Sequence, residues 1–124
     1  MADENREGGL IAWQWSLYPA GHTTRLNLLI HILTVPIFEI GTLTLLGSLA
    51  IAPVYALLGL AMMVGAMAAQ GQGHALEPQP PVRFRGPLDV IARILAEQWI
   101  AFPRFVVTGG FARAWAGASA RSDQ

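Results

Sequence analysis

The sequence LNLLIHILTVPIFEIGTLTLLGSLAIAPVYALLGLAMMVGAMAA, residues 26–69, decides the fold of this chain. Asn27 and Glu39 are nearly the only strongly polar side chains in it. Because about twenty apolar residues suffice for a helix to cross the hydrocarbon core of a bilayer, this run is long enough for two crossings. We therefore expect a transmembrane helical hairpin over residues 24–70, with its turn at residues 47–53.

The composition of the whole chain is that of a membrane protein. Of its 124 residues, 53% are hydrophobic and 13% are charged, whereas charged residues make up about a quarter of a soluble domain. A soluble fold would have to bury a hairpin that is apolar on every face, and too little chain remains to cover it. We predict a single all-α domain, residues 1–124: an integral membrane helical hairpin with flanking interfacial amphipathic helices.

The segments outside the hairpin are more polar. Residues 1–9 are polar and glycine-ended, which indicates a disordered tail. Residues 71–87 are rich in glycine and proline and are expected to form a loop at the membrane surface. Residues 88–115 are expected to be interfacial or partly inserted helices. In the first of these, Asp89, Arg93 and Glu97 recur every four residues, and we expect them to form a solvated face.

Charge and cysteine content exclude several classes of function. The net charge is zero and all eight basic residues are arginines, without the basic block that a nucleic acid would require. No cysteine is present, so a metal could be bound only by imidazole, carboxylate, amide or water. Arginines lie outside both ends of the hairpin, which places these ends in the cytoplasm by the positive-inside tendency. The membrane would be the inner membrane of a bacterium or the endoplasmic reticulum of a eukaryote.

The three histidines of the chain stand at the two ends of the hairpin, His22 and His31 at its start and His74 after its return leg. On one unbroken helix, His22 and His31 would face opposite sides, because nine steps of about 100° end half a turn away. If the helix begins at Thr23 or Thr24, His22 belongs to the preceding loop and can fold back. Antiparallel legs then bring all three histidines to one membrane surface.

Three imidazoles and a nearby carboxylate, Glu77, suit a non-haem Fe(II), Mn or Zn centre. A facial set of histidines and a carboxylate with open positions favours iron and oxygen chemistry. Histidines are also common at bilayer interfaces, so an interfacial role without metal stays open. Glu39 lies about 12 Å deeper than His31 along an α-helix and is a separate candidate for a functional carboxyl group.

These residues resemble the motifs of the 2-hydroxy fatty acid dioxygenase family, membrane proteins of fungi and bacteria. The first motif is His22 and, after eight residues, His31, followed by Pro36, with Arg25 and Asn27 between the histidines. The second is matched by Gly73, His74, Glu77 and Pro81, and Phe84, Pro87 and Leu88 continue it. The resemblance covers residues 13–115. Two departures are Thr34, where the family often has glycine, and a His74-to-Glu77 spacing one residue shorter than usual.

The resemblance implies an Fe(II)-dependent dioxygenase of fatty acid α-oxidation that shortens a 2-hydroxy acyl chain by one carbon. It implies catalytic and iron-binding roles for His22, His31 and His74, with Glu77 as a further ligand that the shorter spacing places in question. The partners would be a 2-hydroxy fatty acid, O₂ and the lipid bilayer, and a homo-oligomer is compatible with the sequence. The substrate carboxylate would be bound by polar residues near the histidines, for which the candidates are Arg25, Asn27, Arg83 and Arg85.

Two other functions are compatible with the same residues. The first is a non-catalytic small membrane scaffold, or an accessory subunit of a membrane complex, whose histidines only contact the interface. The second is a metal-dependent lipid enzyme of another type, such as a hydrolase that uses zinc. The metal content of the protein distinguishes the three: iron, none or zinc.

Overall fold

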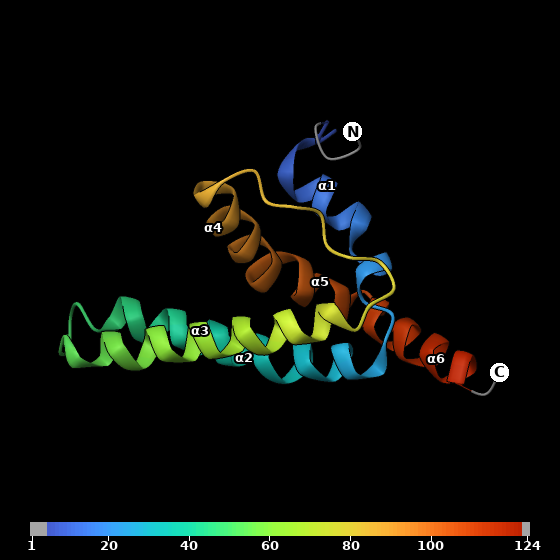
Figure 1. The fold of residues 1–124 in the computed structure, drawn as a ribbon. Coiled ribbons are helices and arrows are strands. Elements are labelled where there is room, and N and C mark those ends of the chain that lie inside the picture. The colour runs from blue at the N-terminus through green and yellow to red at the C-terminus, as the bar shows by residue number, and fades with distance from the viewer. Residues whose placement is uncertain (1–4, 123–124) are drawn as a thin grey trace.

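A computed structural model describes residues 5–122 of the chain, and all the regular secondary structure in this range is helical. Two long helices form a hairpin, and the shorter helices gather over the end of the hairpin that holds both of its connections to the rest of the chain (Figure 1). The elements in chain order are α1 (Gly9–Leu17), the 3₁₀ turn η1 (Pro19–Gly21), α2 (Arg25–Gly47), α3 (Val54–Ala75), α4 (Pro87–Ala96), the π-helix η2 (Glu97–Ala101), α5 (Phe102–Val107) and α6 (Gly110–Ser122).

The all-helical fold and the two long apolar helices, α2 and α3, agree with the expectation from the sequence. The two helices pack closely because Gly41 and Gly59 face each other, and a Cβ on Gly59 would lie 2.6 Å from the carbonyl oxygen of Gly41. The two backbones can approach this closely only where neither residue has a side chain. Pro53 precedes α3 at a position where its missing N–H costs no helical hydrogen bond.

Both legs are long and apolar enough to cross a membrane. Only 28% of the apolar window of α2 and 17% of that of α3 is buried inside the chain. A core helix of a soluble protein is mostly buried, so the leucines that cover this hairpin face outward to an unusual extent. The described part of the chain therefore has two helices that are compatible with insertion into a membrane.

The shorter helices pack onto the hairpin through an aromatic core at its open end. Tyr18 and Phe105 meet edge to face, with ring centroids 5.0 Å apart. The core cluster consists of Tyr18, Leu28, Val35, Ala101, Phe102 and Phe105. It joins the start of α2 to η2 and α5, and so fixes the segments that surround the histidines.

Helix α3 ends later than the glycines of residues 71–73 led us to expect. It continues to Ala75, so His74 lies in its last turn and not in the loop that follows. Gly73 is buried against Asn27 of α2, where a Cβ would collide with the asparagine side chain. The close approach of α2 to α3 thus extends to the ends of both legs.

At both termini the described residues differ from the expected bounds. Residues 1–4 of the predicted disordered tail lie outside the described residues, but Arg6 is held by two hydrogen bonds to Asp89, of 2.6 and 2.9 Å. Helix α6 continues to Ser122 and passes the end predicted at residue 115. Pro103 lies in the first turn of α5, which follows η2 without a loop.

The glycine contact of the hairpin makes a stability prediction. Gly59→Ala should lower the free energy of unfolding by about 1–3 kcal/mol, because the added methyl group meets backbone atoms that cannot move aside. Gly65→Ala is the matched control in the same helix, since a Cβ there meets nothing within 4 Å. It should be neutral or stabilise by up to about 1 kcal/mol. Thermal unfolding of both variants in one detergent tests this, and equal effects would contradict the proposed contact.

Candidate metal centre

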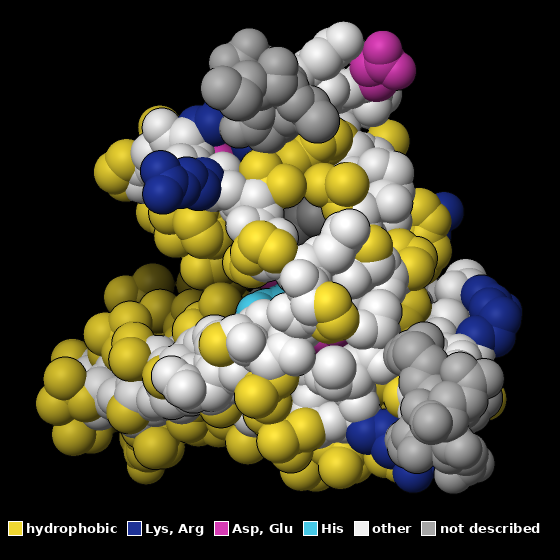
Figure 2. Space-filling view, turned by 45° about the vertical axis from the view of Figure 1, so that its right-hand side comes forward, with side chains coloured by type: hydrophobic (Ala, Val, Ile, Leu, Met, Phe, Trp, Pro, Cys, Tyr) yellow, Lys and Arg dark blue, Asp and Glu magenta, His cyan; other side chains and the backbone are white. Residues whose placement is uncertain are grey.

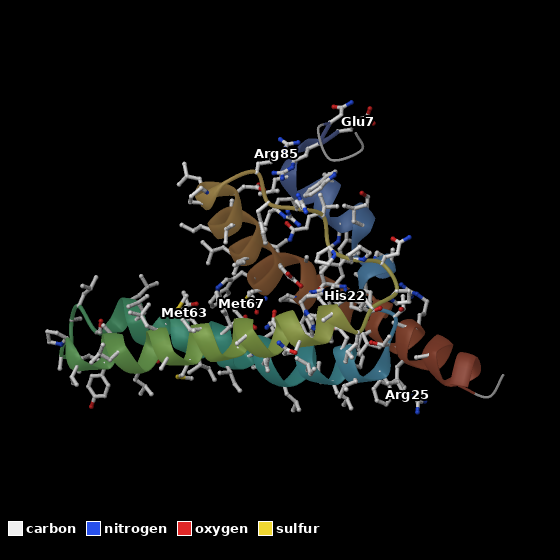
Figure 3. The ribbon with its side chains drawn as sticks, in the orientation of Figure 1. Glu7, His22, Arg25, Met63, Met67 and Arg85 are labelled. Atoms are coloured by element: carbon white, nitrogen blue, oxygen red, sulfur yellow. The ribbon has the colours of Figure 1, made fainter. Side chains whose placement is uncertain are left out.

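Three histidines and one glutamate converge at the open end of the hairpin. The atoms that His22, His31, His74 and Glu97 offer to a metal all lie within 4.8 Å of one another. The imidazole rings form a nearly equilateral triangle, with centroids 4.7, 5.0 and 4.9 Å apart and ring planes 80–85° from one another. Figure 3 shows His22 among the side chains that come together beside the end of α3. The predicted convergence of the three histidines is therefore present.

The distances match a cation-binding site. Oε1 of Glu97 lies 3.5, 3.3 and 3.7 Å from Nε2 of His22, His31 and His74, and Nε2 of His22 lies 3.4 Å from Nε2 of His31. With a metal–ligand bond of about 2.1 Å, neighbouring ligands are separated by about 3.4 Å in a tetrahedral site and about 3.0 Å in an octahedral site. Only small side-chain movements would be needed to bind an ion.

Backbone carbonyls orient two of the three imidazoles. Nδ1 of His22 lies 2.8 Å from the carbonyl oxygen of Tyr18, and Nδ1 of His31 lies 3.0 Å from that of Asn27. A carbonyl oxygen can only accept a hydrogen bond, so each Nδ1 carries the proton and donates it. Unless an imidazole is doubly protonated, its Nε2 then carries a free lone pair that points at the centre of the cluster. This is the arrangement that metal-binding histidines adopt.

A buried carboxylate lies among the three imidazoles, and a positive charge within the cluster would balance it. Side chains of His22 and His31 are almost completely buried, and only 16% of the Glu97 side chain is exposed. Burial lowers the pKa of His22, and the nearby Glu97 carboxylate only partly offsets this effect. Burial alone would raise the pKa of Glu97, but hydrogen bonds from the imidazoles, which form where an Nε2 carries a proton, outweigh burial and hold that pKa well below its usual range. A shared proton or a metal ion can supply the charge.

Tyr18 contacts two members of the cluster. Its ring stacks on that of His22, with centroids 3.9 Å apart, and its hydroxyl group lies 3.5 Å from Oε1 of Glu97. Burial, together with the negative charge of Glu97, raises the pKa of Tyr18 well above its ordinary value. The phenol is therefore protonated at neutral pH and is a hydrogen-bond donor beside the site.

Glu97 reaches the cluster from the first residue of the π-helix. The next residue, Gln98, is fully buried and exchanges two hydrogen bonds, of 2.6 and 3.0 Å, with Gln70 of α3. Gln70 lies one helical turn before His74, so this amide pair fixes the π-helix relative to the turn that carries His74. Single π-turns inside α-helices are frequent at functional sites.

Glu77, which the second motif suggested as a ligand, lies elsewhere. Its two carboxylate oxygens accept hydrogen bonds from the backbone and hydroxyl groups of Thr23 and Thr24, of 2.6–3.1 Å, and from the side chain of Asn27. It therefore caps the start of α2 from the end of α3. By holding Thr23, it also fixes the loop that carries His22. Glu39 is not a member of the cluster either.

The role that the sequence predicted for Glu97 was wrong. It was expected on a solvated face with Asp89 and Arg93, whereas all three side chains are largely buried, with 11–16% exposed. The three side chains do lie on one side of the helical segment, as their spacing predicted. That side faces the protein instead of the solvent. In a helix beside lipid the apolar stripe can face outward, and this inversion was the signal that could have identified Glu97.

A cavity of about 490 Å³ adjoins the cluster, a size that is typical of ligand sites. It lies between α1, α3, α4 and the loop at residues 79–84, and His22, His74 and Glu97 contribute to its wall. Figure 2 shows a histidine side chain at the floor of a hollow, with hydrophobic side chains on the side toward the hairpin turn. The cavity gives a bound molecule direct access to the cluster.

The arginines expected to bind a carboxylate do not line this cavity. Arg25 stacks over the ring of Trp115, 4.6 Å from its centroid, and the carbonyl oxygen of Arg83 accepts a hydrogen bond from Arg93. Arg85 donates its backbone N–H to Asp89, and Asn27 is buried against Glu77. The arginine in the cavity wall is Arg93, whose guanidinium group lies 4.3 Å from the ring centroid of Phe84.

The carboxylate of Glu77 makes a pH prediction. Burial by itself raises the pKa of Glu77, but hydrogen bonds from Thr23, Thr24 and Asn27 outweigh burial and hold the pKa below its ordinary value. Its contribution to stability is thus complete above about pH 4.3 and is lost as the pH falls through the lower pKa of the folded chain. Glu77→Gln should cost about 1–3 kcal/mol at pH 7. The difference in thermal stability from the native chain should shrink between pH 5 and pH 3, and a constant difference would contradict this account.

Comparison with family models, with curated proteins and with solved structures finds no match for this chain. What the protein does must therefore be inferred from its own residues.

Proposed function

We propose that the chain is a membrane-embedded, Fe(II)-dependent dioxygenase that oxidises 2-hydroxy fatty acids and shortens them by one carbon. The observation that carries this proposal is the cluster of three imidazoles and one carboxylate at the wall of a cavity in a protein with two exposed apolar helices. Nitrogen and carboxylate ligands without thiolate suit non-haem iron. The motif resemblance described above is the reason for choosing this substrate class.

The proposed reaction balances without an external reductant. A 2-hydroxy acid, RCH(OH)COOH, and O₂ would give RCOOH, CO₂ and H₂O. The bond between C1 and C2 breaks, C2 becomes the new carboxyl carbon and C1 leaves as CO₂. Oxidation of these two carbons releases four electrons, which is the number that O₂ needs for complete reduction.

His22, His31, His74 and Glu97 would hold the iron, and Glu97 replaces Glu77 in the set implied by the resemblance. When bound, the ion would polarise the substrate oxygens and activate O₂. The remaining roles belong to the chain itself. The hydroxyl group of Tyr18 would donate a hydrogen bond beside the site, and the apolar wall of the cavity would exclude water from the reacting groups.

The membrane arrangement follows from the hairpin. With α2 and α3 across the bilayer, the cluster would lie at the surface where both helices connect to the rest of the chain, and the shorter helices would lie at the interface. The arginines outside the hairpin support a cytoplasmic position for that surface. The membrane would be the bacterial inner membrane or the endoplasmic reticulum, according to the source.

A structural zinc site is the second candidate, because one observation favours it. Four protein ligands, with Glu97 Oε1 3.3–3.7 Å from each imidazole, are typical of closed zinc sites, whereas catalytic sites keep a position open. In that case the protein would be a non-catalytic membrane scaffold or an accessory subunit. The partial exposure of His74, 21%, and the adjoining cavity favour a site that is open to a substrate.

Metal analysis of variants tests the ligand set. His74→Ala and Glu97→Gln should each lower iron content to less than about a tenth of the native value, because each removes one of four converging ligands. Glu39→Gln, which alters a carboxyl group outside the cluster, is the control and should keep iron near one equivalent per chain. Iron measured by plasma emission, with circular dichroism to verify folding, is the readout. Full iron retention in Glu97→Gln would refute this ligand set, and zinc in the native protein would favour the structural site.

Turnover tests the chemistry. The Fe(II)-loaded protein supplied with 2-hydroxypalmitate and O₂ should form pentadecanoic acid and CO₂, with one O₂ consumed for each acid formed. Mass spectrometry of the acid and an oxygen electrode measure both quantities. His74→Ala, which removes a ligand, should lower the rate by at least about a hundredfold. Iron-loaded protein that leaves the hydroxy acid intact would exclude the dioxygenase function.

A further inference from the structure

Helix α4 exposes its apolar side and buries its charged side, the reverse of what a helix in water does. Its apolar residues at i, i+3 and i+7 are exposed, with 81% for Leu88, 55% for Ile91 and 40% for Leu95. Its charged residues Asp89 and Arg93 are turned inward, with 11% of each side chain exposed. Burying the polar stripe and exposing the apolar stripe is unfavourable in water and favourable beside lipid. The exposed stripe of α4 is thus apolar, like the exposed leucines of the hairpin.

Helix α3 carries a second apolar stripe, which leads to the cluster. Leu60, Met63, Met67, Gly71 and His74 lie within about 40° of one line along the helix, at successive spacings of three or four residues. Met63 and Met67 extend from α3 on the side of α4 in Figure 3. Met67, Gly71 and His74 also line the cavity. The stripe therefore runs from the exposed part of the hairpin to an imidazole of the metal centre.

Helices α3 and α4 both contribute apolar residues to the wall of the cavity. The cavity is lined by Met67 and Gly71 of α3 and by Ile94 of α4, and Ile94 is next to the exposed stripe of its helix. In Figure 1, the ribbons of α4 and α3 diverge toward the hairpin turn, which is the part of the molecule that the bilayer would contain. The polar groups of the cavity gather at the opposite end, at His22, His74 and Glu97.

We propose that the cavity takes up a single-chain acyl carboxylate laterally from the bilayer. The chain lies along the stripe of α3 between α3 and α4, its carboxyl end is at the histidine cluster and its methyl end remains in lipid. This proposal rests on the proposed function for the choice of a 2-hydroxy acid. Its test is a binding measurement, which does not depend on turnover.

Two glycines of α3 provide a matched pair of variants. A Cβ built on Gly71 or on Gly65 meets nothing within 4 Å, so both positions accept a side chain within the same helix. Gly71 lines the cavity between Met67 and His74, whereas Gly65 is not among its lining residues. Gly71→Phe should therefore fill the path of the acyl chain, and Gly65→Phe should not.

The experiment measures displacement of the fluorescent fatty acid cis-parinarate by 2-hydroxypalmitate, with iron-loaded protein in detergent and without O₂. Gly71→Phe should raise the Kd of 2-hydroxypalmitate by at least about tenfold, because the ring occupies the space of the chain. Gly65→Phe should change it by less than about twofold. Iron content and circular dichroism verify that both variants are folded and loaded. Equal Kd values for Gly71→Phe and the native protein, or an equal loss in Gly65→Phe, would overturn the proposal.

Met67→Trp tests the direction of the chain. Met67 lies one turn, about 6 Å, farther from His74 than Gly71 does. The tryptophan should weaken binding of 2-hydroxypalmitate and spare 2-hydroxybutyrate, whose chain ends before that point. Weaker binding of 2-hydroxybutyrate alone would overturn the proposed direction. Length-dependent binding without turnover would remove only the dioxygenase chemistry, whereas normal turnover of 2-hydroxypalmitate by Gly71→Phe would remove only this path.

Discussion

The rest of the site depends on one constraint: the fold holds three imidazoles and one carboxylate close together in a largely buried place. Backbone carbonyls of Tyr18 and Asn27 accept hydrogen bonds from Nδ1 of His22 and His31, which leaves the two Nε2 atoms facing each other at 3.4 Å. A proton on one Nε2, or a cation between them, would make this contact favourable. Packing around it supplies the constraint: the aromatic core, the Gln70–Gln98 amide pair and the Glu77 cap leave these side chains little freedom.

Much of the fold could be predicted because it follows from local patterns. The length and uniform apolarity of residues 26–69 predicted the hairpin, and antiparallel legs required His31 and His74 to meet at one end. The end of α3 could not be predicted, because glycines near a helix end usually indicate a loop. Here Gly73 remains helical since α2 packs directly against it through Asn27, and that contact is between residues far apart in sequence.

The carboxylate of the centre was misassigned for a related physical reason. Glu77 is only three residues from His74, and proximity in sequence suggested a shared ligand role. Its oxygens are instead satisfied by Thr23, Thr24 and Asn27, which the return of α3 places beside it. Glu97 arrives from a different helix, and its direction depends on whether α4 turns its polar or its apolar side toward the protein. The periodicity of a sequence gives two faces but not the environment of each.

The lengths of the two hairpin helices also fix the distance between the histidine cluster and the hairpin turn. His31 lies 16 residues before the end of α2 at Gly47, about 24 Å of α-helix, and His74 lies 20 residues after the start of α3 at Val54, about 30 Å. These lengths are close to the thickness of the hydrocarbon layer of a bilayer, about 30 Å. With the proposed crossing of a bilayer, a cluster tied to both legs would lie at the level of the lipid headgroups, where the acid group of an amphiphile resides while its tail stays among its neighbours.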